Sequence, residues 1–115
     1  MKKVVFCLIL VLVLLPPLSA QENPSITIVN NTGYTVLFVY FSSVEADTWG
    51  PDRLAEDQVL LDGQSVTLRL PDPLHVANRY DIMLEDLDGD TYTKMNVTVS
   101  ANSRIVFTFD DIDWE

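Results

Sequence analysis

Residues 80–100, YDIMLEDLDGDTYTKMNVTVS, contain two runs of alternating apolar and polar side chains on either side of an acidic turn. One face of the first run, residues 80–85, carries Tyr80, Ile82 and Leu84. One face of the second run, residues 91–100, carries Thr93, Met95, Val97 and Val99. A repeat of two residues is the pattern of a half-buried β-strand, and Asp-Gly between two such runs is typical of a tight hairpin. The stretch therefore predicts two antiparallel strands.

Five further segments have extended, β-branched or alternating sequence and are predicted strands: residues 25–30, 34–41, 58–61, 64–70 and 104–109. Together with the two runs above they make seven strands at intervals of roughly ten residues. Short strands with one apolar face bury that face by packing two sheets together. The predicted fold class is all-β, a single antiparallel two-sheet β-sandwich of about seven strands with an immunoglobulin-like arrangement.

The segment 34–41, YTVLFVYF, is apolar on both of its alternating faces. Tyr34, Val36, Phe38 and Tyr40 fall on one side, and the residues between them fall on the other. A strand of this kind is covered on both faces, so we expect it to be central in its sheet or to lie at an interface with another chain.

The first twenty residues have the pattern of a secretory signal peptide. Lys2 and Lys3 precede an apolar run of twelve residues, 4–15, which ends at two prolines before Leu18-Ser19-Ala20. Twelve apolar residues are too few to cross a bilayer as a helix, which needs roughly twenty, although an uncleaved anchor is the alternative. We therefore predict a signal peptide over 1–20 that is cleaved near Ala20, a β-sandwich domain over 21–115, and a secreted or periplasmic protein.

Removal of this segment makes the chain more acidic. Loss of the two lysines leaves five basic residues against seventeen acidic ones, so the net charge changes from −10 to −12. Such a chain repels nucleic acid and anionic membranes, so neither is a predicted partner, and stable membrane insertion after cleavage is not expected. The single cysteine, Cys7, lies in the apolar run, so the predicted domain contains no disulfide.

The sequence carries little catalytic chemistry. His75 is the only histidine, and one histidine is too few for a zinc site. A Ser-His-Asp arrangement would have to use His75, but no serine lies in a recognisable nucleophile motif. Pairs of carboxylates occur by chance among seventeen acidic residues, so they do not indicate a glycosidase. We therefore predict that the protein is not an enzyme.

The turn between the two alternating runs has closely spaced carboxylates. Asp86, Asp88 and Asp90 surround Gly89, and Ca²⁺ takes six to eight oxygen ligands of this kind. The order differs from an EF-hand loop, because the glycine precedes the third acid and no helices flank it. These three residues are the predicted metal ligands, with Ca²⁺ as the candidate ion and no other cofactor. The alternative is an ordinary turn rich in Asp and Gly.

If every connection reverses the chain, the turns near residues 30–33, 62–63 and 86–90 and the tail from residue 110 meet at one end of the sandwich. The two long connections, 42–57 and 71–78, then belong to the other end. Acidic side chains gather at the first end. Water, salt or a bound cation would have to screen the repulsion between them.

Residues 26–36, ITIVNNTGYTV, are followed further on by Asp62-Gly63-Gln64-Ser65. These residues resemble the opening of thaumatin-like sandwiches, where a first strand ends in Asn, a Tyr-Thr-Val strand follows and a Gly-x-Ser hairpin comes next. The resemblance covers roughly fifteen positions and implies a β-sandwich without that family's activity, because its many cysteines are missing. The chain also resembles small secreted β-sandwich proteins of bacteria that have no assigned function.

Long connections on a small sandwich commonly carry binding residues. We predict a non-catalytic binding or interaction module for a protein or glycan, with Tyr40 and Trp49 as partner-binding residues. The alternative for Trp49 is that it folds back to cap the core. The alternatives for the protein are a structural or assembly subunit that uses the apolar segment 34–41, and a small hydrolase. The oligomeric state is left open.

Overall fold

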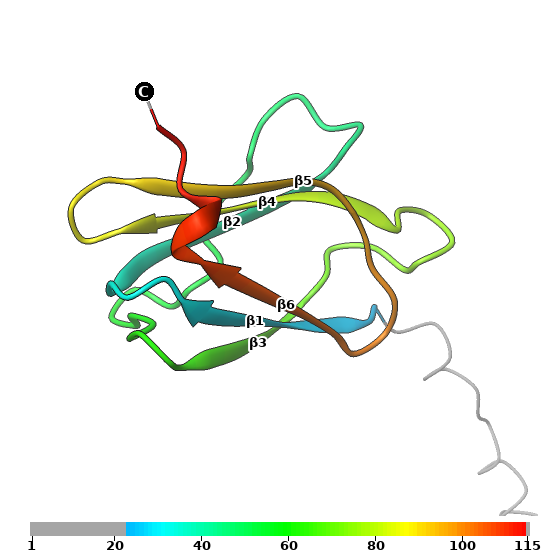
Figure 1. Cartoon of the computed structure of the whole chain (residues 1–115). Helices are drawn as coiled ribbons and strands as arrows, with labels where there is room; N and C mark the ends of the chain where they lie inside the picture. The colour runs from blue at the N-terminus through cyan, green and yellow to red at the C-terminus, as the bar shows by residue number, and fades with distance from the viewer. Residues whose placement is uncertain (1–22, 115) are drawn as a thin grey trace, which may run out of the picture.

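A computed structural model describes residues 23–114 as two facing sheets of three strands each, in the orders β3–β1–β6 and β2–β4–β5 (Figure 1). The strands are β1 (Ser25–Asn31), β2 (Val36–Ser43), β3 (Ser65–Arg69), β4 (Arg79–Asp86), β5 (Thr91–Thr98) and β6 (Ser103–Thr108), and a short 3-10 helix, η2 (Phe109–Asp111), follows. The predicted all-β two-sheet sandwich is confirmed. The predicted signal peptide over 1–20 lies outside the described residues.

Six strands form rather than the predicted seven. In the segment 58–61 only Leu60 is buried, and it makes a single bridge with Val36 instead of a ladder. The prediction of a wholly antiparallel sandwich is also wrong, because β1 and β6 pair in parallel. Both strands begin at the same end of the sandwich, since the short connection after β5 brings the chain back to the end where β1 starts.

β2 is an edge strand, so the prediction that segment 34–41 is central in its sheet is wrong. The alternation is also interrupted by a β-bulge between Val36 and Phe38. A bulge adds one residue to a strand and so changes which residues face inward beyond it. The buried residues of β2 are therefore Val36, Val39 and Phe41.

A second irregularity changes the faces of β5. Its register with β4 shifts between Tyr80 and Ile82, opposite a β5 residue, Asn96, that has a positive φ of 57°. Before the shift Tyr92 is fully buried, whereas Met95, which the sequence assigns to the same face as Val97, is 63% exposed. The predicted faces of residues 91–100 are therefore wrong on the N-terminal side of the bulge.

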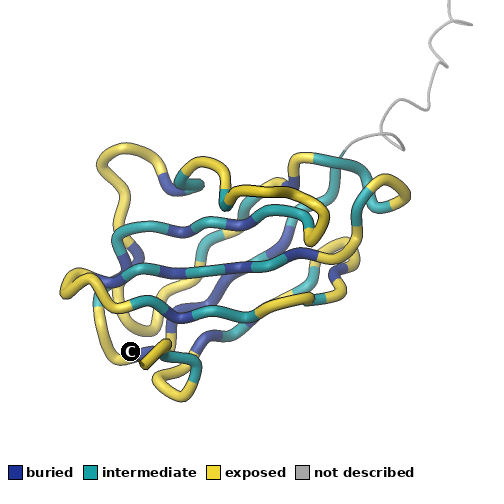
Figure 2. The backbone as a smooth tube through the Cα atoms, turned by 90° about the horizontal axis from the view of Figure 1, so that it is seen from above, coloured by how far each residue is buried: buried dark blue, intermediate teal, exposed yellow. Residues whose placement is uncertain are grey.

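The core lies between the two sheets, and Figure 2 shows buried residues along the strands and exposed residues mainly in the connections. The largest fully buried side chains are Tyr80, Tyr92, Phe41, Phe107, Ile26 and Ile28. Complete burial of one large apolar side chain stabilises a fold by about 1.5–3 kcal/mol. Residues 23–114 contain no cysteine, so this apolar core holds the described domain together without a disulfide.

The connection after β2 covers the free edge of that strand. Val39 donates its N–H to Asp52 Oδ1 at 3.0 Å and accepts the N–H of Arg53 at 2.7 Å. Further along the edge, Val36 and Leu60 exchange two backbone hydrogen bonds of 2.9 Å. Residues 52–60 thus satisfy backbone groups that an edge strand otherwise presents to solvent.

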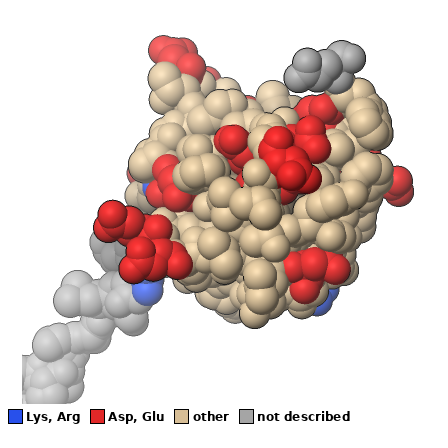
Figure 3. All heavy atoms as spheres, turned by 90° about the vertical axis from the view of Figure 1, so that its left-hand side faces the viewer, with Lys and Arg blue, Asp and Glu red and all other residues tan. Residues whose placement is uncertain are grey.

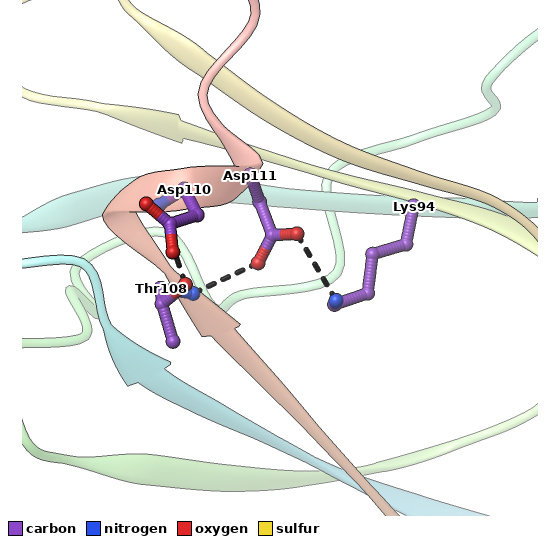
Figure 4. A network of polar contacts seen from close by, with 4 residues as sticks. All are labelled: Lys94, Thr108, Asp110 and Asp111. Carbon is purple, nitrogen blue, oxygen red and sulfur yellow. Dashed lines mark hydrogen bonds and ion pairs between the residues drawn. The ribbon is translucent and has the colours of Figure 1, made fainter.

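The C-terminal segment closes the opposite side of the sandwich. Asp111 in η2 accepts the N–H of Thr108 at 2.9 Å and pairs with Lys94 of β5 at 3.1 Å (Figure 4). Ile112 then forms an isolated bridge with Tyr92. The segment after β6 therefore crosses from one sheet to the other and covers the start of β5. Among residues 23–114, no helix has the length and apolar character needed to span a membrane.

Candidate binding surface and acidic turn

The outer face of the β2–β4–β5 sheet carries aromatic and thioether side chains. Phe38 lies opposite Glu85, and Tyr40 lies opposite Met83, in the β2–β4 register. Directly paired residues of antiparallel strands point to the same side, and all four are partly exposed. The rings of Phe38 and Tyr40 stack with their centroids 6.1 Å apart. We call Phe38, Tyr40 and Met83 the aromatic row.

The outer face of the β3–β1–β6 sheet has a different character. Thr27 and Thr67 lie opposite each other and share a hydroxyl hydrogen bond of 3.0 Å. Arg104 pairs with Thr27 from the other neighbouring strand, and Arg69 pairs with Ser25. One outer face of the sandwich is therefore lined by hydroxyl and guanidinium groups, whereas the other presents the aromatic row.

Trp49 lies on the same side of the molecule as the aromatic row. It lines a shallow hollow of about 170 Å³ together with Ser42, Asp81 and Met95. Ser42 pairs with Asp81 two residues along from the Tyr40–Met83 pair, which is the next position on the same face of the sheet. The structure thus places Tyr40 and Trp49, the two predicted partner-binding residues, on one continuous face. Trp49 is half-buried and does not belong to the buried core, so it does not cap the core.

Carboxylates surround this face. Partial burial, followed by the charges of Glu85 and Asp52, raises the pKa of Tyr40. Asp81 accepts the N–H of Asn96 at 2.8 Å beside the hollow. A guanidinium lies near one end of β4, where Arg79 donates its Nε–H to Asn96 at 2.8 Å. The face as a whole therefore has a negative potential around its aromatic groups.

The three predicted metal ligands do come together. One carboxylate oxygen from each of Asp86, Asp88 and Asp90 lies within 4.8 Å of the others. Asp86 is 2% exposed, however, and it already has hydrogen-bond donors. Its Oδ1 accepts the N–H groups of Asp88 and Asp90 at 3.0 Å each, and its Oδ2 accepts the Tyr92 hydroxyl at 2.8 Å.

Asp86 therefore fixes the conformation of the β4–β5 turn through hydrogen bonds to its backbone. Asp88 and Asp90 are exposed and carry the carboxylates that remain free for an ion. The Ca²⁺ prediction stays a prediction. The hydrogen bond from the Tyr92 hydroxyl to Asp86 does not follow from the sequence, because the alternation places Tyr92 on the face opposite Met95 and Val97, and the register shift in β5 turns it inward. Burial and this hydrogen bond raise the pKa of Tyr92 strongly.

The expected gathering of turns at one end of the sandwich is confirmed. Asp62 accepts the N–H of Gly33 at 2.9 Å, and Leu87 donates to the carbonyl of Thr35 at 2.9 Å, so three turns are in contact. The tail joins them, because Asp113 donates to the carbonyl of Thr91 at 2.8 Å. Figure 3 views this end and shows several groups of acidic side chains on it and few basic ones.

Two further features were not anticipated. A row of exposed aromatic rings, Tyr34, Phe109 and Trp114, lies at the acidic end, with successive centroids 6.0 Å apart. A second hollow, of about 350 Å³, lies between the end of β2 and the start of β4. Residues of the connections after β2 and before β4 line it, including Glu45, Asp72 and Val76. Neither follows from sequence spacing, because the residues come from separate connections. His75 is exposed in the connection 71–78.

Comparison with known proteins supports the fold. No protein-family model matches the chain, and no curated protein matches it. A solved structure described as the NMR structure of the protein from Eubacterium rectale is similar, with a TM-score of 0.58 and 13% sequence identity. The match covers 81% of this chain and 84% of that one. At this identity the likeness shows a shared fold alone. The thaumatin-like resemblance stays a prediction.

Proposed function

We propose that the protein is an exported, non-catalytic binding module whose contact surface is the outer face of the β2–β4–β5 sheet together with Trp49. The observation that carries this proposal is the difference between the two outer faces. One presents Thr27 and Thr67 with exposed arginines, whereas the other presents the aromatic row beside a hollow. Aromatic and methionine side chains are enriched at protein interfaces, where they give large contact areas.

Export supports the same proposal. The sequence before the domain has the charge and apolar pattern of a signal peptide, and a domain of net charge −12 stays soluble outside the cell. A small sandwich whose edge strand β2 is covered by residues 52–60 is a suitable scaffold for a contact surface on the outer face of that sheet.

The test is site-specific photo-crosslinking in the producing cells. A benzoylphenylalanine at position 40 should capture a partner in the exported fraction, and the same group at position 67, on the opposite outer face, should not. Both positions lie on strand surfaces, so neither substitution disturbs the core. Equal capture at both positions, or capture at position 67 alone, would contradict the proposed surface.

The assembly-subunit alternative uses the same face, because the aromatic row extends along β2. Its signature is a crosslink at position 40 between two copies of this chain. Sedimentation equilibrium at high protein concentration distinguishes the two functions, since a monomer contradicts self-assembly. The charge of −12 on each copy disfavours self-association at low ionic strength.

A further inference from the structure

The shallow hollow beside the aromatic row has a lining with a specific chemical character. Trp49 contributes an indole, Met95 a thioether, and Asp47 and Asp81 two carboxylates. Ser42 and Thr48 add hydroxyl groups. Among the residues that the structure describes, no lysine or arginine lines the hollow, and Arg79, on the neighbouring part of the face, donates to the Asn96 side chain. An aromatic ring, an apolar wall and two negative charges form the usual setting for an organic cation.

The two carboxylates have no cationic partner within the described part of the chain. Lys94 precedes Met95 in β5, but its ammonium pairs with Asp111 at 3.1 Å and lies over the ring of Phe107, not in the hollow. Asp81 accepts one backbone N–H through its Oδ1, which leaves its Oδ2 for a second donor. Asp47 is exposed on the connection after β2. A positively charged ligand would therefore neutralise the charges of Asp47 and Asp81, which no basic side chain of the described residues pairs with.

We propose that the hollow binds a lysine or arginine side chain of a partner protein, an inference that rests on the proposed function and names the chemistry of that partner. The cationic group lies against the indole of Trp49 and between Asp47 and Asp81. The methylene stem of the side chain packs on Met95, as long basic side chains commonly do on apolar surfaces. The volume of about 170 Å³ accommodates one such side chain.

The neighbouring aromatic row favours a peptide segment over a free amine. Tyr40 and Met83 lie one register step of two residues from Ser42 and Asp81. An extended chain rises about 3.3 Å per residue, so two of its residues span the same step. A segment that runs along β2 with its basic side chain in the hollow therefore places the residue two positions away over Tyr40 and Met83. An apolar residue suits that position.

The test is a titration followed by ¹H–¹⁵N NMR. The probe is the peptide acetyl-Gly-Leu-Gly-Lys-Gly-Leu-Gly-amide, which has an apolar residue two positions from lysine in both directions. The comparison peptide replaces lysine with norleucine, which keeps the stem and removes the charge. We expect amide shifts at Asp81 and Met95 with the lysine peptide, and an affinity about tenfold lower with the norleucine peptide.

Variants of the hollow provide the control. Asp47→Asn should weaken binding of the lysine peptide about threefold or more, and Trp49→Leu about tenfold. Asp57→Asn removes the same charge from an exposed position of the same connection outside the hollow, and it should change the affinity less than twofold. The spectrum of each variant without peptide shows that its fold is intact.

Several results would overturn the inference. Equal affinity for the two peptides, or an equal loss in D47N and D57N, would show that the hollow does not recognise the cation. Butylamine binding as tightly as the peptide would assign the hollow to a small amine instead of a partner protein. Absence of shifts at the hollow with every probe would also overturn it. Shifts confined to Tyr40 and Met83 would overturn the cation-binding role of the hollow. They would still agree with the proposed contact surface on the outer face of the β2–β4–β5 sheet.

Discussion

Two buried polar side chains hold the turns of this small sandwich, and both act on backbone groups. Asn30 is fully buried, donates to the carbonyls of Tyr34 and Leu60 at 2.8 and 2.9 Å, and accepts the N–H of Thr32. Asp86 accepts the N–H groups of Asp88 and Asp90 in the β4–β5 turn. From the sequence alone, residues 30–33 are predicted to be a turn because Asn and Gly tolerate positive φ, and residues 86–90 are identified only as a turn with clustered acidic residues. The structure adds that one side chain in each turn is buried and hydrogen-bonded to the turn's backbone.

Replacement of Asp86 by asparagine tests its role in the turn. The amide nitrogen of the new side chain cannot accept a hydrogen bond, and the charge that strengthens the other bonds is lost. Hydrogen bonds to charged groups contribute about 1.5–3 kcal/mol each, so we expect the free energy of unfolding to fall by about 2–3 kcal/mol. Urea denaturation measures it. Asp88→Asn is the control, because Asp88 is exposed, and an equal effect of the two variants would contradict the structural role.

Tyr92 predicts an alkaline limit to stability. Burial and the hydrogen bond to Asp86 raise the pKa of Tyr92 well above its ordinary value of 10.0. Above pH 10 the unfolded chain therefore releases a proton that the folded protein keeps, and the free energy of unfolding falls by about 1.4 kcal/mol per pH unit for this residue. Below pH 10 both states keep the proton, so Tyr92 adds no pH dependence there.

The measurement is urea denaturation between pH 8 and pH 11. Tyr92→Phe lowers stability by about 1 kcal/mol at pH 8, because Asp86 loses a donor, but its alkaline decline is shallower than that of the parent protein. Tyr80 also has a pKa raised by burial, so part of the decline remains in this variant. A decline of the same slope in both proteins would show that Tyr92 titrates normally.

At the scale of elements, alternation located the strands well, and bulges limited what it could assign. The segments around β1, β3, β4 and β6 follow from β-branched or period-two patterns, from the two Asp-Gly turns and from the turn at residues 30–33. The faces of β2 and β5 do not, since one added residue reverses the inward set and leaves the alternation in the sequence unchanged. The segment 58–61 has the composition of a strand, yet tertiary contact gives it one bridge.

The aromatic row and the hollow show a similar limit. Tyr40 and Trp49 are predicted partner-binding residues because aromatic residues in and beside a long connection often bind partners. Their common face depends on the bulge in β2 and on the path of the connection after it, which returns over the sheet. Asp81 and Met95 join the site only through cross-strand pairing, so no local pattern could have indicated them.

The covered edge of β2 depends strongly on one carboxylate. Asp52 Oδ1 accepts the N–H groups of Val39 and Leu54 at 3.0 Å each. We expect Asp52→Ala to lower the free energy of unfolding by about 2 kcal/mol and to speed hydrogen exchange of the Val39 amide. Asp52→Asn keeps an acceptor and should lose about half as much. Asp57→Ala, at an exposed position of the same connection, serves as the matched control. Unchanged exchange at Val39 in D52A would contradict this account of the edge.

Considered as a whole molecule, the protein has far more acidic than basic side chains, and many acids share one end (Figure 3). Repulsion between these charges opposes folding, and dissolved salt screens it with a Debye length of about 10 Å at 0.1 M. We therefore expect NaCl to raise the melting temperature steadily between 10 and 300 mM. Replacement of Asp88 and Asp90 together by asparagine should raise the melting temperature at low salt and reduce its dependence on NaCl. A melting temperature that is independent of salt would contradict this.

The same experiment tests the predicted cation site. CaCl2 at matched ionic strength should raise the melting temperature beyond NaCl, and the double variant should abolish this additional rise, if the turn holds Ca²⁺. Equal effects of the two salts on the parent protein would reject the site. MgCl2 is the control for divalent charge, because Mg²⁺ requires a stricter octahedral arrangement.

The coverage of β2 by residues 52–60 and of β5 by the segment after β6 has a consequence for the protein at high concentration. A sandwich with exposed edge strands can pair or exchange strands with a neighbouring copy and form a domain-swapped or fibrillar polymer. Here residues 52–60 cover the edge of β2, and the segment after β6 covers the start of β5. Polymer growth through β2 or the start of β5 must therefore wait for one of these segments to detach. Shelf life in concentrated solution is then governed by how often they open, and much less by how often the whole domain unfolds.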